Sequence, residues 1–212
     1  MTLNPTGISG RAACVSLKSM PKAAITRLFL EGRTHHHWLD RPVDDAVLHE
    51  LYELARMPPT SANTQPMRLV FVRSAEAKAR LAPAIWPNNV DKVMAAPVTA
   101  IVAHDLEFYE QMPTLMPGVD VRGRLITRPP DVLEKMARQS ATLQAGYLIL
   151  AARAVGLDCG PIGGFDTDKV DEVFMEGTKW RSNLLLNLGY ADHEKLVPRR
   201  PRLEFDVACR IV

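Results

Sequence analysis

The chain has 212 residues, 47% hydrophobic and 24% charged, a balance typical of a folded globular protein rather than a disordered or collagen-like chain. Its 26 basic and 24 acidic residues leave a formal net charge of +2, too small to favour a nucleic-acid partner. No stretch reaches the ~18 apolar residues of a membrane span, and three widely spaced cysteines without a CxxC motif indicate a reducing, cytoplasmic location. We expect one domain, residues 21–212, preceded by a flexible N-terminal extension over residues 1–20.

The predicted helices have recognisable ends. Asp44 or Asp45 can accept the unpaired N–H groups at the start of one helix, and Pro58 ends it. Ser74 and Asp166 are placed to cap two shorter helices in the same way. Three runs rich in β-branched and aliphatic residues are typical of buried strands. Helices are thus predicted at 21–30, 44–57, 74–81, 131–155 and 166–175, and strands at 69–72, 98–103 and 182–189.

Two further segments shape the expected architecture. Residues 104–130 contain several prolines, so we interpret them as an excursion or lid with short helical pieces. The long helix at 131–155 carries many small residues, which permit another helix to approach closely, either in the core or across a dimer interface. Few strands among long helices indicate the α+β class.

The histidine run is the most conspicuous polar motif, but it does not predict a metal site. Adjacent side chains diverge in a helix or a strand, so His35, His36 and His37 cannot all bind one ion. Arg33 gives the run another meaning, because an arginine fork beside hydroxyl and imidazole groups suits a phosphate. Solvated surface residues are the plainer alternative.

Two loops offer polar or close backbone contacts. The segment 59–66 places Ser61, Asn63 and Gln65 between prolines. It is either a loop that bonds its own backbone or a rigid array of donors and acceptors for a polyol or heterocycle. The glycine-rich segment 160–164 lacks both P-loop and GxGxxG spacing, which disfavours a Rossmann dinucleotide site. Its glycines would still let backbone N–H groups approach a flat ligand.

Five stretches, in this order along the chain, resemble the nitroreductase family of FMN flavoproteins. They are Arg33-Thr34-His35 and residues 59–66, 89–92, 160–166 and 200–203. The resemblance extends from about residue 25 to the C-terminus. It implies a nitroreductase-like α+β sandwich with a central, mostly antiparallel sheet flanked by helices. It also implies an intertwined homodimer that exchanges terminal segments and binds FMN at the interface.

The resemblance implies a role for each matching residue. The arginines at both ends of the matched region would hold the FMN phosphate, and the polar loop would reach the flavin from the partner subunit. Lys92, with Asn89, would contact the pyrimidine edge and stabilise negative charge on the reduced flavin. His37 and Gly163 differ from the residues that many members have there. The expected FMN contacts are Arg33, Thr34, His35, His37, Ser61, Asn63, Gln65, Asn89, Lys92, Ile162, Gly163, Gly164, Arg200 and Arg202.

The activity implied by the family is hydride transfer from NADH or NADPH through flavin N5 to a second substrate. Residues 96–113, 156–166 and 182–190 are most similar to malonic semialdehyde reductases of pyrimidine degradation, which form 3-hydroxypropanoate. The carboxylate of such an aldehyde would need a cation, and Arg122 and Arg124 in the excursion are candidates. The alternatives are a broad-specificity reductase of nitroaromatics or quinones and a flavin-binding module without catalysis.

Overall fold

A four-stranded antiparallel sheet forms the centre of the computed structural model, which describes residues 19–212. The strands are β1 (Met67–Val72), β2 (Val98–Asp105), β3 (Asp158–Ile162) and β4 (Trp180–Gly189). Their order is β1-β2-β4-β3, so β1 and β3 are the edges. The outer side of β1 has no strand partner within the described residues, so this edge is free.

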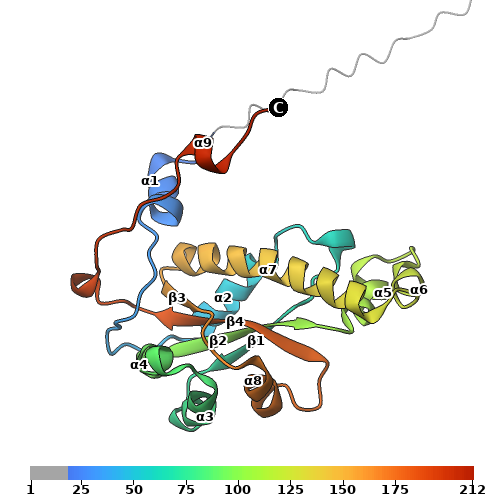
Figure 1. Ribbon diagram of the computed structural model, residues 1–212, viewed down its shortest axis with the longest axis horizontal. Coiled ribbons are helices and arrows are strands. Elements are labelled where there is room, and N and C mark those ends of the chain that lie inside the picture. Colours follow the sequence, from blue (N-terminus) through green and yellow to red (C-terminus); the bar gives the residue numbers. More distant parts are fainter. Residues whose placement is uncertain (1–18) are drawn as a thin grey trace, which may run out of the picture.

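Helices cover both faces of the sheet (Figure 1). On one face lie α2 (Asp45–Ala55) and α7 (Pro130–Ala154), and on the other lie α3 (Ala75–Leu81), α4 (Val90–Ala95) and α8 (Thr167–Phe174). Each face is covered by apolar side chains from its own helices, so the domain contains two hydrophobic cores separated by the sheet. The predicted α+β class, with a central antiparallel sheet flanked by helices, is confirmed.

Strand β2 contributes side chains to both hydrophobic cores. Its residues Val98, Ala100 and Val102 pack towards α2 and α7, whereas Ile101 and Ala103 pack towards α3 and α8. This alternation is the two-residue period of a strand, in which successive side chains point to opposite faces. Because β2 is buried along its whole length, its sequence is nearly continuously apolar and shows no polar alternation.

The excursion after β2 consists of short helices, as predicted. They are η5 (Phe108–Gln111), α5 (Met112–Leu115) and α6 (Val121–Leu125). Their buried side chains Phe108, Met112 and Leu125 form a third apolar cluster with the first turns of α7. The excursion is therefore packed onto α7 and forms the end of the molecule beyond the sheet (Figure 1).

The terminal segments lie on one side of the sheet and meet each other. After α1 (Lys22–Ile25) the chain continues as a π-helix, η1 (Thr26–Leu30). The Arg199 guanidinium donates to the Leu30 carbonyl at 2.6 Å and the Gly32 carbonyl at 2.8 Å, which ties the C-terminal segment to the N-terminal one. Beyond this contact α9 (Phe205–Ala208) projects away from the sheet (Figure 1).

The predicted helices are found, and two of the three predicted caps form; at the start of α2 Asp44 makes no side-chain cap bond. The Ser74 hydroxyl accepts the Ala77 N–H at the start of α3, and the Asp166 carboxylate accepts the Lys169 N–H at the start of α8. The predicted first helix is divided between α1 and the π-helix. Of the expected N-terminal extension, residues 1–18 lie outside the described residues. No helix in residues 19–212 combines the length and hydropathy needed to cross a membrane.

Strand β3 was not predicted, because Gly160 and Pro161 are depleted in strands. The structure explains both residues. β3 is an edge strand, so a proline without an N–H group is tolerated there. A Cβ atom on Gly160 would lie 2.3 Å from the His35 carbonyl oxygen, so only glycine lets the histidine segment run alongside β3.

Candidate functional site

Asn89 and Lys92 lie together at the start of α4, beside the glycine loop that follows β3. Lys92 Nζ donates to Asn89 Oδ1 at 2.9 Å, and Asn89 Nδ2 donates to the Gly164 carbonyl at 3.3 Å. A Cβ atom on Gly164 would lie 2.4 Å from Asn89 Nδ2, so a larger residue at this position would displace the Asn89 amide. The structure thus brings together three of the residues that the sequence analysis assigned to the flavin. Of the other two in the loop, Ile162 is buried in the core and Gly163 is exposed.

The histidine segment runs past this end of the sheet, and its three rings have different surroundings. His35 is buried, and its Nε2 lies 3.4 Å from Asp158 Oδ1. Burial, followed by the charge of Lys92, lowers the pKa of His36, and His36 Nδ1 is a buried atom without a hydrogen-bond partner among the described residues. His37 is exposed.

His36 is therefore the ring with an unsatisfied polar atom in the neighbourhood of Lys92, although the sequence analysis selected His35 and His37 instead. Thr34 is exposed and forms no side-chain hydrogen bond within the described residues. The period of an extended segment, in which His36 points opposite to its two neighbours, was the available sequence signal. An orphaned buried nitrogen such as His36 Nδ1 fits a site that a ligand completes.

An arginine cluster lies where the N- and C-terminal segments meet. Arg33 donates to the Val197 carbonyl, and Arg153 donates to the Leu28 carbonyl at 2.7 Å. In residues 19–212 these guanidinium groups pair with backbone carbonyls and form no salt bridge with a carboxylate. A cavity of about 230 Å³ opens beside them, lined by Arg27, Glu31, Gly32, Arg33, Arg153, Asp158, Cys159 and His193.

The two C-terminal arginines of the predicted phosphate site follow this junction. Arg200 and Arg202 are exposed, and Arg202 donates only to carbonyls of its own segment, those of Arg200 and Pro201, at 2.9 and 3.2 Å. Their forks are therefore free to turn towards an anion. Of the three predicted phosphate arginines only Arg33 lines the small cavity, and guanidinium groups that are not paired with a carboxylate are suited to the phosphate end of FMN.

The polar loop before β1 has an unusual backbone. Ala62, Asn63 and Gln65 adopt positive φ angles of 49°, 54° and 40°, in the left-handed region that residues other than glycine rarely occupy. The loop is held by hydrogen bonds: the Gln65 N–H donates to Thr60 Oγ1 at 3.2 Å, and Asn63 Nδ2 donates to the Leu115 carbonyl at 3.1 Å. Strain maintained in this way is a feature of functional loops.

Arg68 connects this loop to the end of β2. Its guanidinium donates to the Gln65 carbonyl at 3.0 Å and to Asp105 Oδ2 at 2.7 Å, and both side chains of the ion pair are largely buried. Inside the core, the Gln144 side chain accepts the Met67 N–H at 3.1 Å. These contacts keep the strained loop in position while Ser61 and Asn63 remain exposed.

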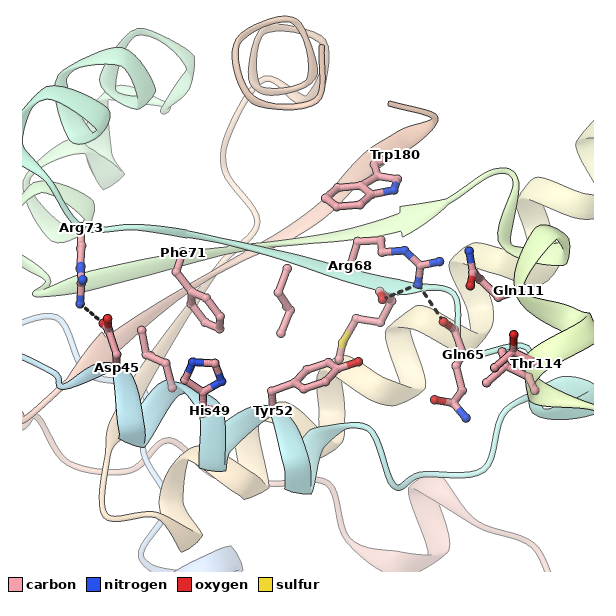
Figure 2. A pocket seen from close by; sticks show the side chains of 14 residues that line it. Asp45, His49, Tyr52, Gln65, Arg68, Phe71, Arg73, Gln111, Thr114 and Trp180 are labelled. Atoms are coloured by element: carbon pink, nitrogen blue, oxygen red, sulfur yellow. Dashed lines mark hydrogen bonds and ion pairs between the residues drawn. The ribbon is translucent and has the colours of Figure 1, made fainter. Parts of the chain in front are cut away.

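A large groove extends from this loop along the free edge of β1. Its volume is about 770 Å³, and Figure 2 shows it between α2, which contributes His49 and Tyr52, and β1, which contributes Arg68 and Phe71. Gln65 lies at one end of the groove, and the Arg73–Asp45 ion pair closes the other end.

The polar loop and the Asn89–Lys92 pair lie at opposite ends of β2. The loop leads into β1 at Met67, which pairs with His104 near the end of β2, whereas α4 leads into β2 at Val98. The eight residues of β2 separate the two groups, a length of about 24 Å at the usual rise per residue. A single chain therefore does not bring the two predicted groups of flavin contacts together.

The predicted substrate arginines are differently placed. Arg122 forms a bidentate ion pair with Glu110, at 2.8 and 2.7 Å, so its fork is already occupied. Arg124 is exposed, and neither arginine lines the groove or the cavity beside Arg33. In the described part of the chain, no group of three or more His, Cys, Asp or Glu side chains is arranged to hold a metal ion.

Comparison with known proteins decides the family. Residues 31–190 match the Nitroreductase family. The chain belongs to the nitroreductase family. A provisionally named NADH dehydrogenase/NAD(P)H nitroreductase of Stutzerimonas stutzeri is 54% identical over 88% of this chain and 94% of its own length. A protein of the same name from Rhodopseudomonas palustris is 48% identical over 92% of this chain and 98% of its own length.

Solved structures agree with this assignment at the level of the fold. A provisionally named nitroreductase of Exiguobacterium sibiricum, crystallised in complex with FMN, has a TM-score of 0.80 and 24% identity over 88% of this chain and 96% of its own. A provisionally named nitroreductase of Bacillus subtilis, ydfN, has a TM-score of 0.79 and 24% identity over 90% of this chain and 99% of its own. The predictions of a nitroreductase-family oxidoreductase and of its FMN and NAD(P)H cofactors are confirmed at the level of the family.

Proposed function

We propose that this protein is a homodimeric, FMN-dependent oxidoreductase that transfers a hydride from NAD(P)H to a small-molecule acceptor. One observation carries the proposal: polar groups that suit a flavin lie at both ends of β2, about 24 Å apart by strand length. If both groups contact the same flavin, they must come from two copies of the chain. Each site would then combine the α4 end of one subunit with the polar loop of the other.

The residues at the α4 end supply donors and charge. Lys92 uses one of its three N–H donors on Asn89, which leaves two for a ligand. Asn89 in turn holds the glycine loop close by. We propose that Lys92 and Asn89 bind the pyrimidine edge of FMN, and that His36 Nδ1 finds its missing partner there. When bound, FMN supplies the N5 atom that accepts and donates the hydride.

The arginine cluster would anchor the other end of the cofactor. We propose that Arg33, Arg200 and Arg202 bind the phosphate, because guanidinium forks make strong, bidentate bonds to phosphate oxygens. Thr34 and His37 are exposed close to Arg33 in the sequence and remain candidates for this end. His35, which is buried against Asp158, would instead position the segment.

The surface features of the chain support a dimer. Apolar side chains of the C-terminal segment, Leu203, Phe205, Val207 and Ile211, are exposed. The groove along the free edge of β1 contains apolar walls from Tyr52 and Phe71. We propose that the terminal segment of each subunit covers apolar surface of the other, in an interface larger than ~2,000 Å².

The proposed acceptor is a small carbonyl compound. Malonic semialdehyde follows from the resemblance of three sequence tracts, and reduction of nitroaromatics or quinones is the broader alternative. Since Glu110 occupies the fork of Arg122, Arg124 is the better candidate for a substrate carboxylate. If so, Arg124→Ala raises the KM for malonic semialdehyde and leaves quinone reduction unchanged. An equal loss on both acceptors would contradict a carboxylate-binding role.

Purification and turnover test the proposal. The protein should absorb blue light, contain one FMN per subunit, and oxidise NADH or NADPH anaerobically with members of a panel of aldehydes, quinones and nitroaromatics. The double variant Arg200→Ala/Arg202→Ala should lose flavin, since each charge-assisted bond to a phosphate contributes ~1.5–3 kcal/mol. Arg56→Ala, which removes an exposed cation paired with Glu53, is the control. A colourless protein that binds no FMN would contradict the proposal.

A further inference from the structure

A buried lysine lies behind the Asn89–Lys92 pair. Lys78 belongs to α3, yet its exposure is only 4%, because it points into the core on the same face as Leu81. Its Nζ donates to the Val93 carbonyl at 2.7 Å and to Thr99 Oγ1 at 2.6 Å. Burial lowers its pKa to about 8, and among the described residues it forms no ion pair with a carboxylate. An ammonium group is costly to bury, so its presence in the core calls for a reason.

The last turn of α4 explains the buried lysine, because its backbone carbonyls lack donors from the helix itself. In a continuing helix, the Val93 carbonyl would accept an N–H from residue 97, but Pro97 has none. The Lys92 carbonyl would accept from Ala96, where the chain has already left the helix with ψ 135°. Both carbonyls therefore need donors from elsewhere in the chain. Lys78 supplies one of them to Val93.

Asn187 supplies the other donor. Its Nδ2 donates to the Lys92 carbonyl at 3.0 Å, and its Oδ1 accepts the Thr99 hydroxyl at 2.7 Å. Lys78 donates to the same hydroxyl, so the three side chains form one continuous hydrogen-bonded network. The network joins α3, β2 and β4 to the last turn of α4, and hydrogen bonds in the low-dielectric interior hold such elements in one arrangement.

We propose that Lys78, through Thr99 and Asn187, is a positioning residue that fixes the backbone of Lys92 and so places the Lys92 and Asn89 side chains at the edge of the flavin. This inference rests on the proposed function, since it concerns how the same site is built. Lys78 itself does not touch the cofactor. It acts on the site through Lys92, whose carbonyl it holds by way of Asn187 and whose neighbour Val93 it binds directly.

The test compares Lys78→Met, Lys92→Met and the double variant. Methionine keeps most of the side-chain volume and removes the charge and the donors. The readouts are the midpoint potential of the bound flavin and the dissociation constant of FMN. Lys92→Met should lower the potential, because a cation near the flavin favours its reduction. Lys78→Met should lower it in the same direction and weaken FMN about tenfold. If Lys78 acts through Lys92, the double variant should be no worse than Lys92→Met alone.

Two further variants accompany these measurements. Lys179→Met removes an exposed lysine and should change neither quantity. Thr99→Val keeps volume and charge but breaks the link to Asn187, so it should shift the potential in the same direction by a smaller amount; it also serves if Lys78→Met does not fold. An unchanged potential in Lys78→Met or Thr99→Val, or additive effects in the double variant, would overturn the inference. A wild-type protein that binds no FMN would overturn the proposed function instead.

Discussion

At the start of β2, α4 is held from inside the core by the side chains of Lys78 and Asn187, whereas at the end of β2 the polar loop is held in a strained conformation near the surface. The first arrangement links Lys78, Thr99 and Asn187 to two carbonyls of α4 by four hydrogen bonds within one chain. The second keeps three non-glycine residues at positive φ and leaves Ser61 and Asn63 exposed. In the proposed dimer, the α4 half of each site would thus be fixed within one subunit, and the exposed loop would be supplied by the other.

The ion pair of the polar loop gives the largest expected effect. Asp105→Ala leaves the largely buried Arg68 guanidinium without its carboxylate and removes the acceptor of the Glu107 N–H. We expect the free energy of unfolding to fall by about 3 kcal/mol. Chemical denaturation measures it. The control Asp45→Ala breaks the exposed ion pair with Arg73 and should cost less than ~1 kcal/mol. Equal losses in both variants would mean that the Arg68 contact does not hold the loop.

The buried lysine at the other end predicts a pH dependence of stability. Its pKa is about 8 in the folded protein, against an ordinary value of 10.5. Between these values the unfolded chain holds the proton that the folded chain has released, so stability rises with pH. From pH 7 to pH 10 the wild type should gain about 2 kcal/mol relative to Lys78→Met. Denaturation at a series of pH values measures the difference, and parallel curves would show that Lys78 titrates normally.

Backbone strain in the loop gives the smallest effect. Ala62→Gly should raise the free energy of unfolding by about 1 kcal/mol, because glycine adopts a φ of 49° without steric cost. The same substitution at Ala79, an exposed position in α3, should lower it by ~0.5–1 kcal/mol. If both glycines destabilise the protein alike, the loop stores no strain.

Most helices and strands of the core can be predicted from the sequence. The features that cannot be predicted depend on contacts between residues far apart in the chain. Ser74 and Asp166 cap their helices as predicted because capping is local, whereas Asp44 occupies the N-cap position of α2 without a side-chain cap bond. β3 was not predicted because Gly160 and Pro161 are depleted in strands. Both residues are explained by long-range features, namely the neighbouring His35 carbonyl and the edge position of the strand.

In the candidate site, too, local motifs could be predicted from the sequence and long-range contacts could not. The motif residues Asn89, Lys92 and Gly164 could be selected from the sequence and do lie together. Lys78 could have been noticed as a lysine aligned with Leu81 on a buried helix face, but the carbonyls it binds belong to another helix. Arg122 was selected for its charge and its place in the excursion, and its pairing with Glu110, twelve residues away, could not be deduced from the sequence.

The central claim, that each flavin site combines the α4 end of one subunit with the polar loop of the other, has a direct test in mixed dimers. One subunit carries Lys92→Met and the other carries Asn63→Ala/Gln65→Ala, and differently tagged chains allow the heterodimer to be purified. Both lesions then fall in one site, and the second site contains only wild-type contacts. We predict one FMN bound per heterodimer with wild-type affinity, whereas each mutant homodimer binds FMN weakly at both sites. Weak binding at both sites of the heterodimer would contradict the account.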